Sequence, residues 1–443
     1  MSLIKHVIFI AANFICLPFS IAQNISDDKN ISSNQYKLIN PEIVSAFYKF
    51  NQHKLFWFNN GEQYYLLRIK LRNIIDSSEN AGLEKNKYHF TDLKERINSA
   101  FADKDSLAAM HLDKIFTDAA IAYAKDIYQG SNVSDWVNND EISKKYEGAD
   151  NNYLLNNFLA VKTPGDLQTF FNYIESDNKE YAALKIELKD QSKSDNDLKK
   201  LQLEISLNLF RWIHHFHFDK YIIVNITSAT LRYYTSDSLS GTMKVVVGKP
   251  STKTPRFATY CDQIIIYPYW NVPSSIALNE LLPKFKKNPN HMDELNMLLM
   301  NAAGKIIDHH KLNWKSYNKS YFPFRIRQST GCDNSLGVIK FNLTSPYSVY
   351  LHDTNNKNVF MSGFRFYSHG CIRIEEPIVL ANKFLNMKID SKYLESCLKD
   401  QIPVPIKLDK PVPVFVVYIP VEMINSKVKY YNDVYGLLKT HLK

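Results

Sequence analysis

The stretch YLHDTNNKNVFMSGFRFYSHGCIRI, residues 350–374, decides how the rest of the chain is interpreted. A short apolar run ends at His352, a mostly polar loop follows, and Cys371 comes directly after His369 and Gly370. This pattern predicts a strand that delivers His352, a connecting loop, and a tight turn that presents Cys371.

Histidine and cysteine in this arrangement suit acyl transfer. An isolated thiol has a pKa of about 8.5, and a histidine in hydrogen-bond reach or the amides of a tight turn lower it. Glycine lets the backbone turn sharply and lets amides approach a reacting carbonyl oxygen. We therefore predict His352 as base, Cys371 as nucleophile, and the amides around Gly370 and Cys371 as oxyanion donors. Spacing alone also allows Cys371 to be a buried structural cysteine.

The residues around this stretch predict a β-rich domain that begins after Asp219. Residues 221–225 and 230–234 flank a short polar connection and predict a hairpin. Further strands are expected at 243–247, 263–267, 337–341, 348–351 and 412–419. Between 276 and 321 the pattern turns helical, notably over 294–307, which predicts an insertion of the kind that forms lids or substrate clamps.

The first half of the chain, from about residue 35 to 218, has helical periodicity. Apolar residues along 112–130 share one helix face, and Gly130 stands where a C-cap belongs. A second stripe runs over 198–212, and the polar stretch 190–197 predicts an exposed loop. Helices followed by strands indicate the α+β fold class.

Composition limits the classes of function. The chain has 443 residues, 45% of them apolar and 13% aromatic, which excludes disorder and suffices for two or three domains. Its 54 Lys and Arg exceed its 45 Asp and Glu, so the net charge is +9. The basic residues are spread out and mostly Lys, so we predict no nucleic-acid partner. A mildly basic surface suits an anionic polymer, or serves only solubility.

The first 22 residues predict a secretory signal peptide. Lys5 precedes an apolar stretch over residues 7–19, and small residues at positions 20 and 22 suit a signal peptidase. A membrane-anchoring helix is the alternative. No later stretch reaches 18 uninterrupted apolar residues, so we predict an exported mature chain without a transmembrane segment.

Four cysteines follow the predicted signal peptide: Cys261, Cys332, Cys371 and Cys397. None forms a CxxC pair, which argues against a cysteine zinc site. If one of them stays a free thiol for chemistry, at most one disulfide forms, and the sequence does not tell which pair forms it.

The motif in the opening stretch resembles that of a known family. His352 is followed after fifteen residues by Ser368-His369-Gly370-Cys371, which resembles the signature of the YkuD-type L,D-transpeptidases, enzymes that cross-link bacterial peptidoglycan. Arg373 stands where the pattern often has Asn, although Arg also occurs there in the family. Further similar blocks cover most of the mature chain: residues 118–130, 247–250, 253–255, 268–273, 276–321, 327–337 and 411–418. They resemble the large, scaffold-bearing subfamily, although we find no wall-binding repeat domain in 131–200.

The resemblance implies a domain plan. A signal peptide covers 1–22, a helical scaffold domain 23–218, and a C-terminal tail 421–443. Between them, residues 219–420 form a β-sandwich-like catalytic domain with a helical capping insertion at 276–321.

The resemblance also implies the activity, a peptidoglycan L,D-transpeptidase in the periplasm that forms 3→3 cross-links. Cys371 attacks the carbonyl of the diamino acid at position three of a tetrapeptide donor stem, D-Ala leaves, and a thioester remains. His352 takes the thiol proton and later activates the side-chain amine of the acceptor stem. Neither a cofactor nor a metal is implied, and carbapenem-type inhibitors are expected to bind.

Other residues of the motif receive secondary roles. Gly370, His369 and Ser368 are predicted to shape the site, with His369 as the rival base. Arg373 is predicted to bind substrate carboxylates, since a guanidinium matches a carboxylate in bidentate fashion. Arg365 could do the same or be a solvated loop residue, and we predict no catalytic role for Cys332.

Two other functions remain open from the sequence. An L,D-carboxypeptidase or endopeptidase would hydrolyse the same acyl-enzyme, because the acyl-enzyme is common to both outcomes. A non-catalytic wall-binding scaffold protein would use the helical half to recruit partners.

Overall fold

The computed structural model describes residues 37–441 apart from 100–105, 192–195, 386–387 and 399–400. The predicted signal peptide, residues 1–22, lies outside the described residues. Within the described residues, none of the helices combines the length and the apolar character that crossing a membrane requires.

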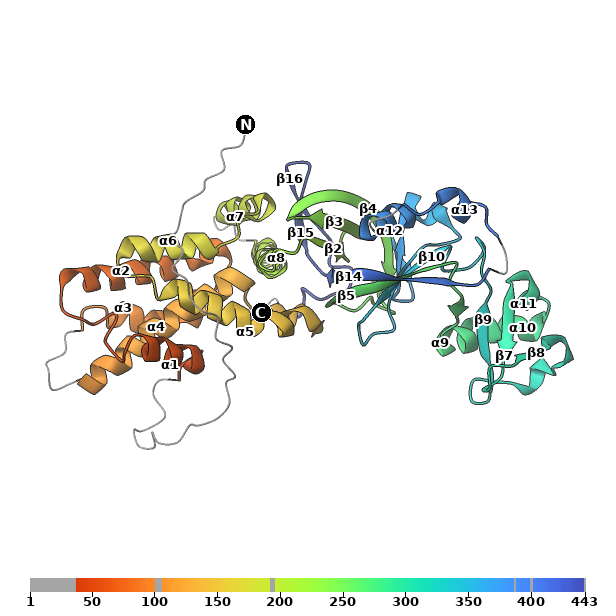
Figure 1. Ribbon diagram of the computed structural model, residues 1–443, viewed down its shortest axis with the longest axis horizontal. Helices are drawn as coiled ribbons and strands as arrows, with labels where there is room; N and C mark the ends of the chain where they lie inside the picture. Colours follow the sequence, from red (N-terminus) through yellow and green to blue (C-terminus); the bar gives the residue numbers. More distant parts are fainter. Residues whose placement is uncertain (1–36, 100–105, 192–195, 386–387, 399–400, 442–443) are drawn as a thin grey trace. The chain divides into compact units, whose positions relative to one another are not determined.

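Helices make up the first half of the described chain, and strands dominate the second half (Figure 1), which confirms the α+β class. The longest helix, α4, ends at Gln129 directly before Gly130, as the apolar stripe predicted. The helices of this half are α1 (Pro41–Phe50), α2 (Glu62–Asp76), α3 (Phe90–Glu95), α4 (Ser106–Gln129), α5 (Glu141–Phe158), α6 (Pro164–Ile174), α7 (Lys179–Gln191) and α8 (Asp197–His214).

One large sheet of ten strands organises the second half, and one of these strands, β1 (Asn139–Asp140), comes from the helical half. The strands are β1 (Asn139–Asp140), β2 (Lys220–Asn225), β3 (Thr230–Thr235), β4 (Ser238–Gly248), β5 (Phe257–Ile266), β10 (Ile339–Leu343), β11 (Leu351–His352), β12 (Phe366–Ser368), β13 (Ile372–Ile374) and β14 (Val404–Val417). Their order is β1-β5-β10-β11-β13-β4-β3-β2-β14, and β12 pairs with β4. Because β14 pairs with both β2 and β5, the path closes on itself.

The sheet agrees with most strands expected from the sequence. The predicted hairpin is β2–β3, in which Tyr221 lies opposite Tyr234. The strand predicted over 348–351 is wrong in extent, since β11 covers only Leu351 and His352. β14 begins eight residues earlier than expected, at Val404, because it continues along β5 beyond an irregularity in the pairing.

The insertion predicted over 276–321 has a sheet of its own as well as helices, and the first and last strands of that sheet along the chain extend it to residues 270–328. Its elements are β6 (Trp270–Asn271), α9 (Ser274–Ile276), a π-helical turn (Ala277–Leu281), α10 (Leu282–Lys287), α11 (His291–Glu294), β7 (Met297–Met300), β8 (Ile306–Ile307) and β9 (Arg325–Gln328). The strand order is β6-β9-β7-β8. The helix expected over 294–307 is therefore wrong. Leu and Met favour helices intrinsically, but pairing with β9 buries alternate residues of β7 and decides the conformation.

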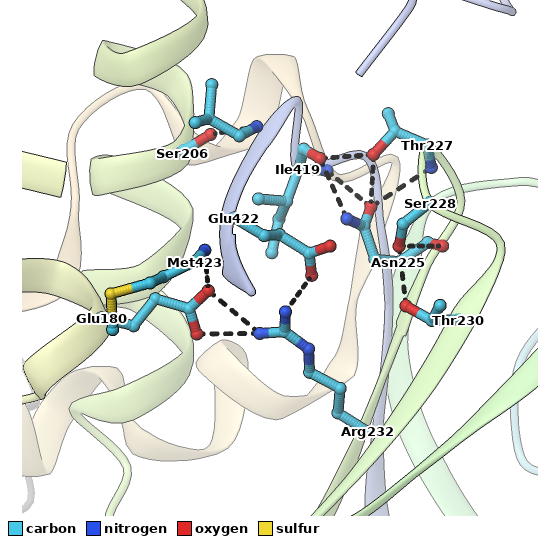
Figure 2. Close-up of polar contacts among 11 residues, drawn as sticks. Glu180, Ser206, Asn225, Thr227, Ser228, Thr230, Arg232, Ile419, Glu422 and Met423 are labelled. Carbon is cyan, nitrogen blue, oxygen red and sulfur yellow. Dashed lines mark hydrogen bonds and ion pairs between the residues drawn. The ribbon is translucent and has the colours of Figure 1, made fainter. Parts of the chain in front are cut away.

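A buried ion cluster joins the helical half to the sheet (Figure 2). Arg232 of β3 pairs with Glu180 of α7 at 2.8 Å and with Glu422 at 3.3 Å. Glu422 belongs to β15 (Val421–Ile424), which forms a hairpin with β16 (Lys427–Tyr430). Two carboxylates thus share one guanidinium, and burial raises the pKa of Glu422. The cluster therefore connects α7, the sheet and the chain segment after residue 420.

One disulfide lies at the edge of the sheet domain. It joins Cys332, before β10, to Cys397, after α13 (Ser391–Glu395). Cys261 and Cys371 are free thiols. Cys371 is thus available for chemistry, and Cys332 has a structural partner.

Replacing both bridged cysteines by alanine is expected to lower the free energy of unfolding by about 2–4 kcal/mol. The bridge joins residues 65 positions apart, so it restricts the unfolded chain strongly. Denaturant unfolding followed by tryptophan fluorescence measures the change. Reduced wild-type protein serves as the control and should unfold at the midpoint of the double variant. Equal midpoints for oxidised wild type and the double variant would contradict the expectation.

Candidate active site

Two short parallel strands carry the predicted base and nucleophile. β11 pairs with β13 so that Leu351 lies opposite Ile372 and His352 lies opposite Arg373. Leu351 and Ile372 are fully buried in the core of the sheet. Because side chains alternate along a strand, the neighbouring His352, Arg373 and Cys371 lie on the other face. Strand pairing therefore puts these three predicted residues on one face of the sheet.

A tight turn precedes Cys371. Gly370 has φ +113°, a conformation that favours glycine. Its N–H donates to Ser368 Oγ at 3.1 Å, and Ser368 Oγ donates to the Cys371 carbonyl at 2.6 Å. The Gly370 N–H is thus already hydrogen-bonded within the turn. It is therefore not the free oxyanion donor that the sequence led us to expect. The Cys371 N–H has no hydrogen-bond acceptor among the described residues.

Side chains of the loop after β4 donate hydrogen bonds to the carbonyls of this turn. Thr254 Oγ1 donates to the Gly370 carbonyl at 2.8 Å, and Thr252 Oγ1 donates to the Ser368 carbonyl at 3.0 Å. Tyr435, close to the C-terminus, donates its hydroxyl to the Gly248 carbonyl at 2.6 Å. The segment after residue 420 thus contacts the loop that is hydrogen-bonded to the Cys371 turn, which the sequence did not indicate.

The environment of His352 fixes its tautomer and its charge. Nδ1 lies 2.5 Å from the Asp353 carbonyl oxygen, which only accepts, so Nδ1 carries the proton and Nε2 keeps its lone pair. Burial, together with the positive charges of Arg373 and Lys340, lowers the pKa of His352 to about 3. His352 is therefore neutral at physiological pH and can accept a proton at Nε2.

The thiol of Cys371 is half-buried, and its Sγ lies 3.8 Å from the Ser348 carbonyl. Burial raises the pKa of Cys371, against hydrogen bonds from Tyr350 and the charges of Lys340 and Arg373 that lower it. This differs from the lowered pKa expected from the sequence, because desolvation outweighs the nearby donors and cations. The resting pair is a neutral imidazole and a protonated thiol.

Two residues of the site were missed by the sequence analysis. Lys340 of β10 lies directly opposite His352, and its Nζ is 4.2 Å from the centre of the Tyr350 ring. Tyr350 stands two residues before His352, and its ring centroid is 5.6 Å from that of His352. Strand alternation places Tyr350 on the same face as His352 and could have indicated it. Lys340 depends on the register between β10 and β11, which the sequence did not show.

Lys340 and Arg373 are both partly buried cations beside the thiol. Burial lowers the pKa of each, while the neighbouring Cys371 raises it. Neither cation forms an ion pair with an Asp or Glu in the part of the chain that the structure describes. The site therefore offers two cations without an acidic protein partner.

His369 and Arg365 are engaged elsewhere. His369 Nε2 lies 2.6 Å from Glu280 Oε1, so this motif histidine contacts the π-helical turn of the insertion. Arg365 donates to the carbonyls of Val245 at 3.2 Å and Ala229 at 3.1 Å. Arg365 thus contacts the backbone of β4 and of the turn before β3, so it is not simply a solvated loop residue, and its role toward substrate stays a prediction.

Asp353 anchors the peptide whose carbonyl orients His352. Its carboxylate accepts from Val338 N at 3.0 Å and from Thr354 N at 2.7 Å, and it pairs with Lys357. Gly337 packs directly on this carboxylate and has φ +59°. A Cβ at residue 337 would overlap Asp353 Cγ, so both the space and the conformation require glycine.

Gly337→Ala is expected to slow acylation of the enzyme by about tenfold or more, because moving Asp353 displaces the His352 ring. It should also lower the free energy of unfolding by about 1–3 kcal/mol. Gly304→Ala is the matched control, since Gly304 also has positive φ, +79°, but has open space around its Cβ position. Stopped-flow acylation and denaturant unfolding give both values, and equal acylation rates for the two variants would contradict the positioning role.

Family models match both halves of the chain. Residues 219–406 match the L,D-transpeptidase catalytic domain, YkuD, and residues 42–188 match the Scaffold domain. A curated Haemophilus influenzae protein with the provisional name L,D-transpeptidase is 33% identical over 248 residues. The match covers 55% of this chain and 49% of the relative, so it spans about half the length of that protein.

Solved L,D-transpeptidases share little sequence identity with this chain. An LD transpeptidase in complex with imipenem has 14% sequence identity and a TM-score of 0.21, covering 45% of this chain and 59% of that chain. An L,D-transpeptidase from Mycobacterium smegmatis has 13% identity and a TM-score of 0.20, covering 45% of this chain and 58% of that chain.

The chain belongs to the YkuD-type L,D-transpeptidases, a family of cysteine-dependent enzymes. It joins their catalytic domain to a Scaffold domain, which confirms the resemblance found in the sequence.

Proposed function

We propose that this protein is a periplasmic peptidoglycan L,D-transpeptidase that forms 3→3 cross-links through a thioester on Cys371. The observation that supports it best is the pairing of β11 with β13, which puts neutral His352 and the free thiol of Cys371 on one face of the sheet. Residues 1–22 would be the signal peptide, 23–218 the scaffold domain, 219–420 the catalytic domain with capping insertion 276–321, and 421–443 the C-terminal segment.

In the first step Cys371 Sγ attacks the carbonyl carbon of the diamino acid at position three of the donor stem. Its proton passes to His352 Nε2, the nitrogen that is free to accept one. The carbonyl oxygen becomes negative and accepts a hydrogen bond from the Cys371 N–H. This N–H has no other acceptor among the described residues. His352 then gives the proton to the D-Ala nitrogen as the carbon–nitrogen bond breaks. D-Ala leaves, and the thioester remains.

In the second step the side-chain amine of an acceptor stem attacks the thioester carbon. His352 Nε2 takes a proton from this amine, and the carbon–sulfur bond breaks. The proton passes to the departing sulfur, so that the thiol of Cys371 is restored and His352 is neutral again. The product is an amide between two stems, and no atom of the enzyme is consumed.

Lys340 and Arg373 support substrate binding and formation of the thiolate in this proposal. Cations without an acidic protein partner are suited to carboxylates of the stem peptide, and Arg373 can bind one in bidentate fashion. Their charges also favour the thiolate as it forms, although burial keeps the resting pKa of Cys371 raised. The same charges keep His352 neutral at rest, so that Nε2 is free to receive the proton, and they also make the imidazole a weaker base.

The test is the mass of the products after incubation with tetrapeptide muropeptides. A dimer with the mass of two monomers less one D-Ala supports transpeptidation. A monomer that has lost D-Ala, without any dimer, indicates the L,D-carboxypeptidase alternative, and unchanged substrate favours the non-catalytic scaffold. Cys371→Ala is the control for product formed by other proteins in the preparation.

A further inference from the structure

We propose that Asp293, His309 and His310 form a binding site for a divalent transition-metal ion, with Zn²⁺ as the best fit. The site lies in the insertion and takes no part in the acyl-transfer chemistry proposed above. The Nε2 atoms of His309 and His310 each lie 3.2 Å from Asp293 Oδ2. All three ligand atoms lie within 4.8 Å of one another.

These separations match a shared metal ion. Zinc binds imidazole nitrogen and carboxylate oxygen at about 2.0–2.1 Å, and tetrahedral geometry then separates two ligand atoms by about 3.3 Å. The two nitrogen–oxygen distances are both 3.2 Å. Three protein ligands leave a fourth position for water. Two imidazoles favour Zn²⁺, Cu²⁺ or Ni²⁺ over Mg²⁺ or Ca²⁺, which prefer oxygen ligands alone.

Neighbouring residues hold the two histidines in place. Trp314 Nε1 donates to the His309 carbonyl at 3.0 Å, and the Trp314 ring packs on Phe285 in the core of the insertion at 5.5 Å. Asp308 Oδ1 accepts from the His310 backbone N–H at 3.1 Å. The backbone that carries the two histidines is therefore held by packing and hydrogen bonds.

The two imidazole rings lie close together. The centroids of His309 and His310 are 4.1 Å apart, so both rings can reach one ion beside Asp293. The side chains of His310 and Asp293 are both 53% exposed, which leaves a path for the ion and for water.

The ion would cross-link two segments of the insertion. Asp293 precedes β7, and the two histidines follow β8, so the ligands close a segment of 16 residues around the β7–β8 hairpin. Binding to the folded insertion alone would raise its apparent stability with metal concentration. In the sequence these three residues form no recognisable zinc motif.

Calorimetric titration of untagged, chelator-treated full-length protein with Zn²⁺ tests the site. One ion per chain is expected, and Asp293→Asn and His310→Ala should each weaken binding by about tenfold to a hundredfold or more. His291→Ala is the matched control. His291 lies on the same short helix as Asp293, α11, but pairs with Glu294 at 2.7 Å. It should bind Zn²⁺ as the wild type does.

Thermal unfolding with and without Zn²⁺ provides a second measurement. The melting temperature should rise with Zn²⁺ in the wild type and in His291→Ala, and stay constant in His310→Ala. His310 is half exposed, so His310→Ala should fold, and circular dichroism verifies this. Binding that is equally tight in wild type, Asp293→Asn and His310→Ala, or no binding to wild type, would overturn the proposal. Equal loss in His291→Ala would place the ion elsewhere and overturn it too.

Discussion

Cys371→Ala is expected to abolish release of D-Ala from tetrapeptide stems, with a loss of at least about 10³-fold. The sulfur forms the only covalent bond to substrate in the proposed reaction, so no other side chain replaces it. The folded state should persist, because the Cys371 side chain is only half-buried at the edge of the site. Quantifying free D-Ala over time, together with a circular dichroism spectrum of the variant, checks both points.

Cys261→Ala is the matched control for this result. Cys261 is the other free cysteine of the described chain, but it is fully buried in the sheet core and burial raises its pKa. The control should keep its activity once folding has been verified. Substantial D-Ala release by folded Cys371→Ala would show that another nucleophile operates.

The second large effect concerns His352 and pH. His352→Ala is expected to slow acylation by a carbapenem about 10²–10⁴-fold, since it removes the general base. In wild type the acylation rate should change less than about twofold between pH 7 and pH 5, because burial and two cations lower the pKa of His352 to about 3. A base with an ordinary pKa of about 6.5 would instead lose about 25-fold in rate over this range. Stopped-flow fluorescence measures the rate at each pH.

His369→Ala separates the two histidines of the motif. His369 is paired with Glu280, so its loss should reduce acylation far less than the loss of His352. A larger effect for His369→Ala than for His352→Ala would reverse the assignment of the base.

Folding must be verified at low pH in the same experiment. A buried neutral histidine binds its proton more readily in the unfolded chain, so its contribution to stability is present above about pH 6.5 and is lost as pH falls. At pH 5 this loss amounts to about 2 kcal/mol. Circular dichroism at each pH separates unfolding from titration of the base.

The sequence predicted those parts of the fold that depend on local patterns. Apolar periodicity predicted α4 and α8, and β-branched runs predicted the β2–β3 hairpin. A buried face repeats every three or four residues in a helix and every second residue in a strand, so it is visible in the sequence. The conformation of 297–307 could not be predicted this way. Its Leu and Met residues fit either state, and pairing with β9, some 28 residues later, decides between them.

The residues of the candidate site that belong to one sequence motif could be predicted. His352, Ser368, Gly370 and Cys371 lie within one stretch, and their chemistry is evident from residue type. Lys340 depends on strand register instead, since it lies opposite His352 only through the β10–β11 pairing. The direction of the thiol pKa was missed for the same reason, because desolvation depends on the packed environment and not on the motif.

The most direct measurement is a peptide-mapped mass spectrum of the protein after incubation with a carbapenem. We expect one adduct per chain, located on the peptide that contains Cys371 and absent from Cys371→Ala. Peptides with Cys261 and with the Cys332–Cys397 bridge should remain unmodified. Folded protein that forms no adduct, or an adduct on Cys261 in place of Cys371, would contradict the account.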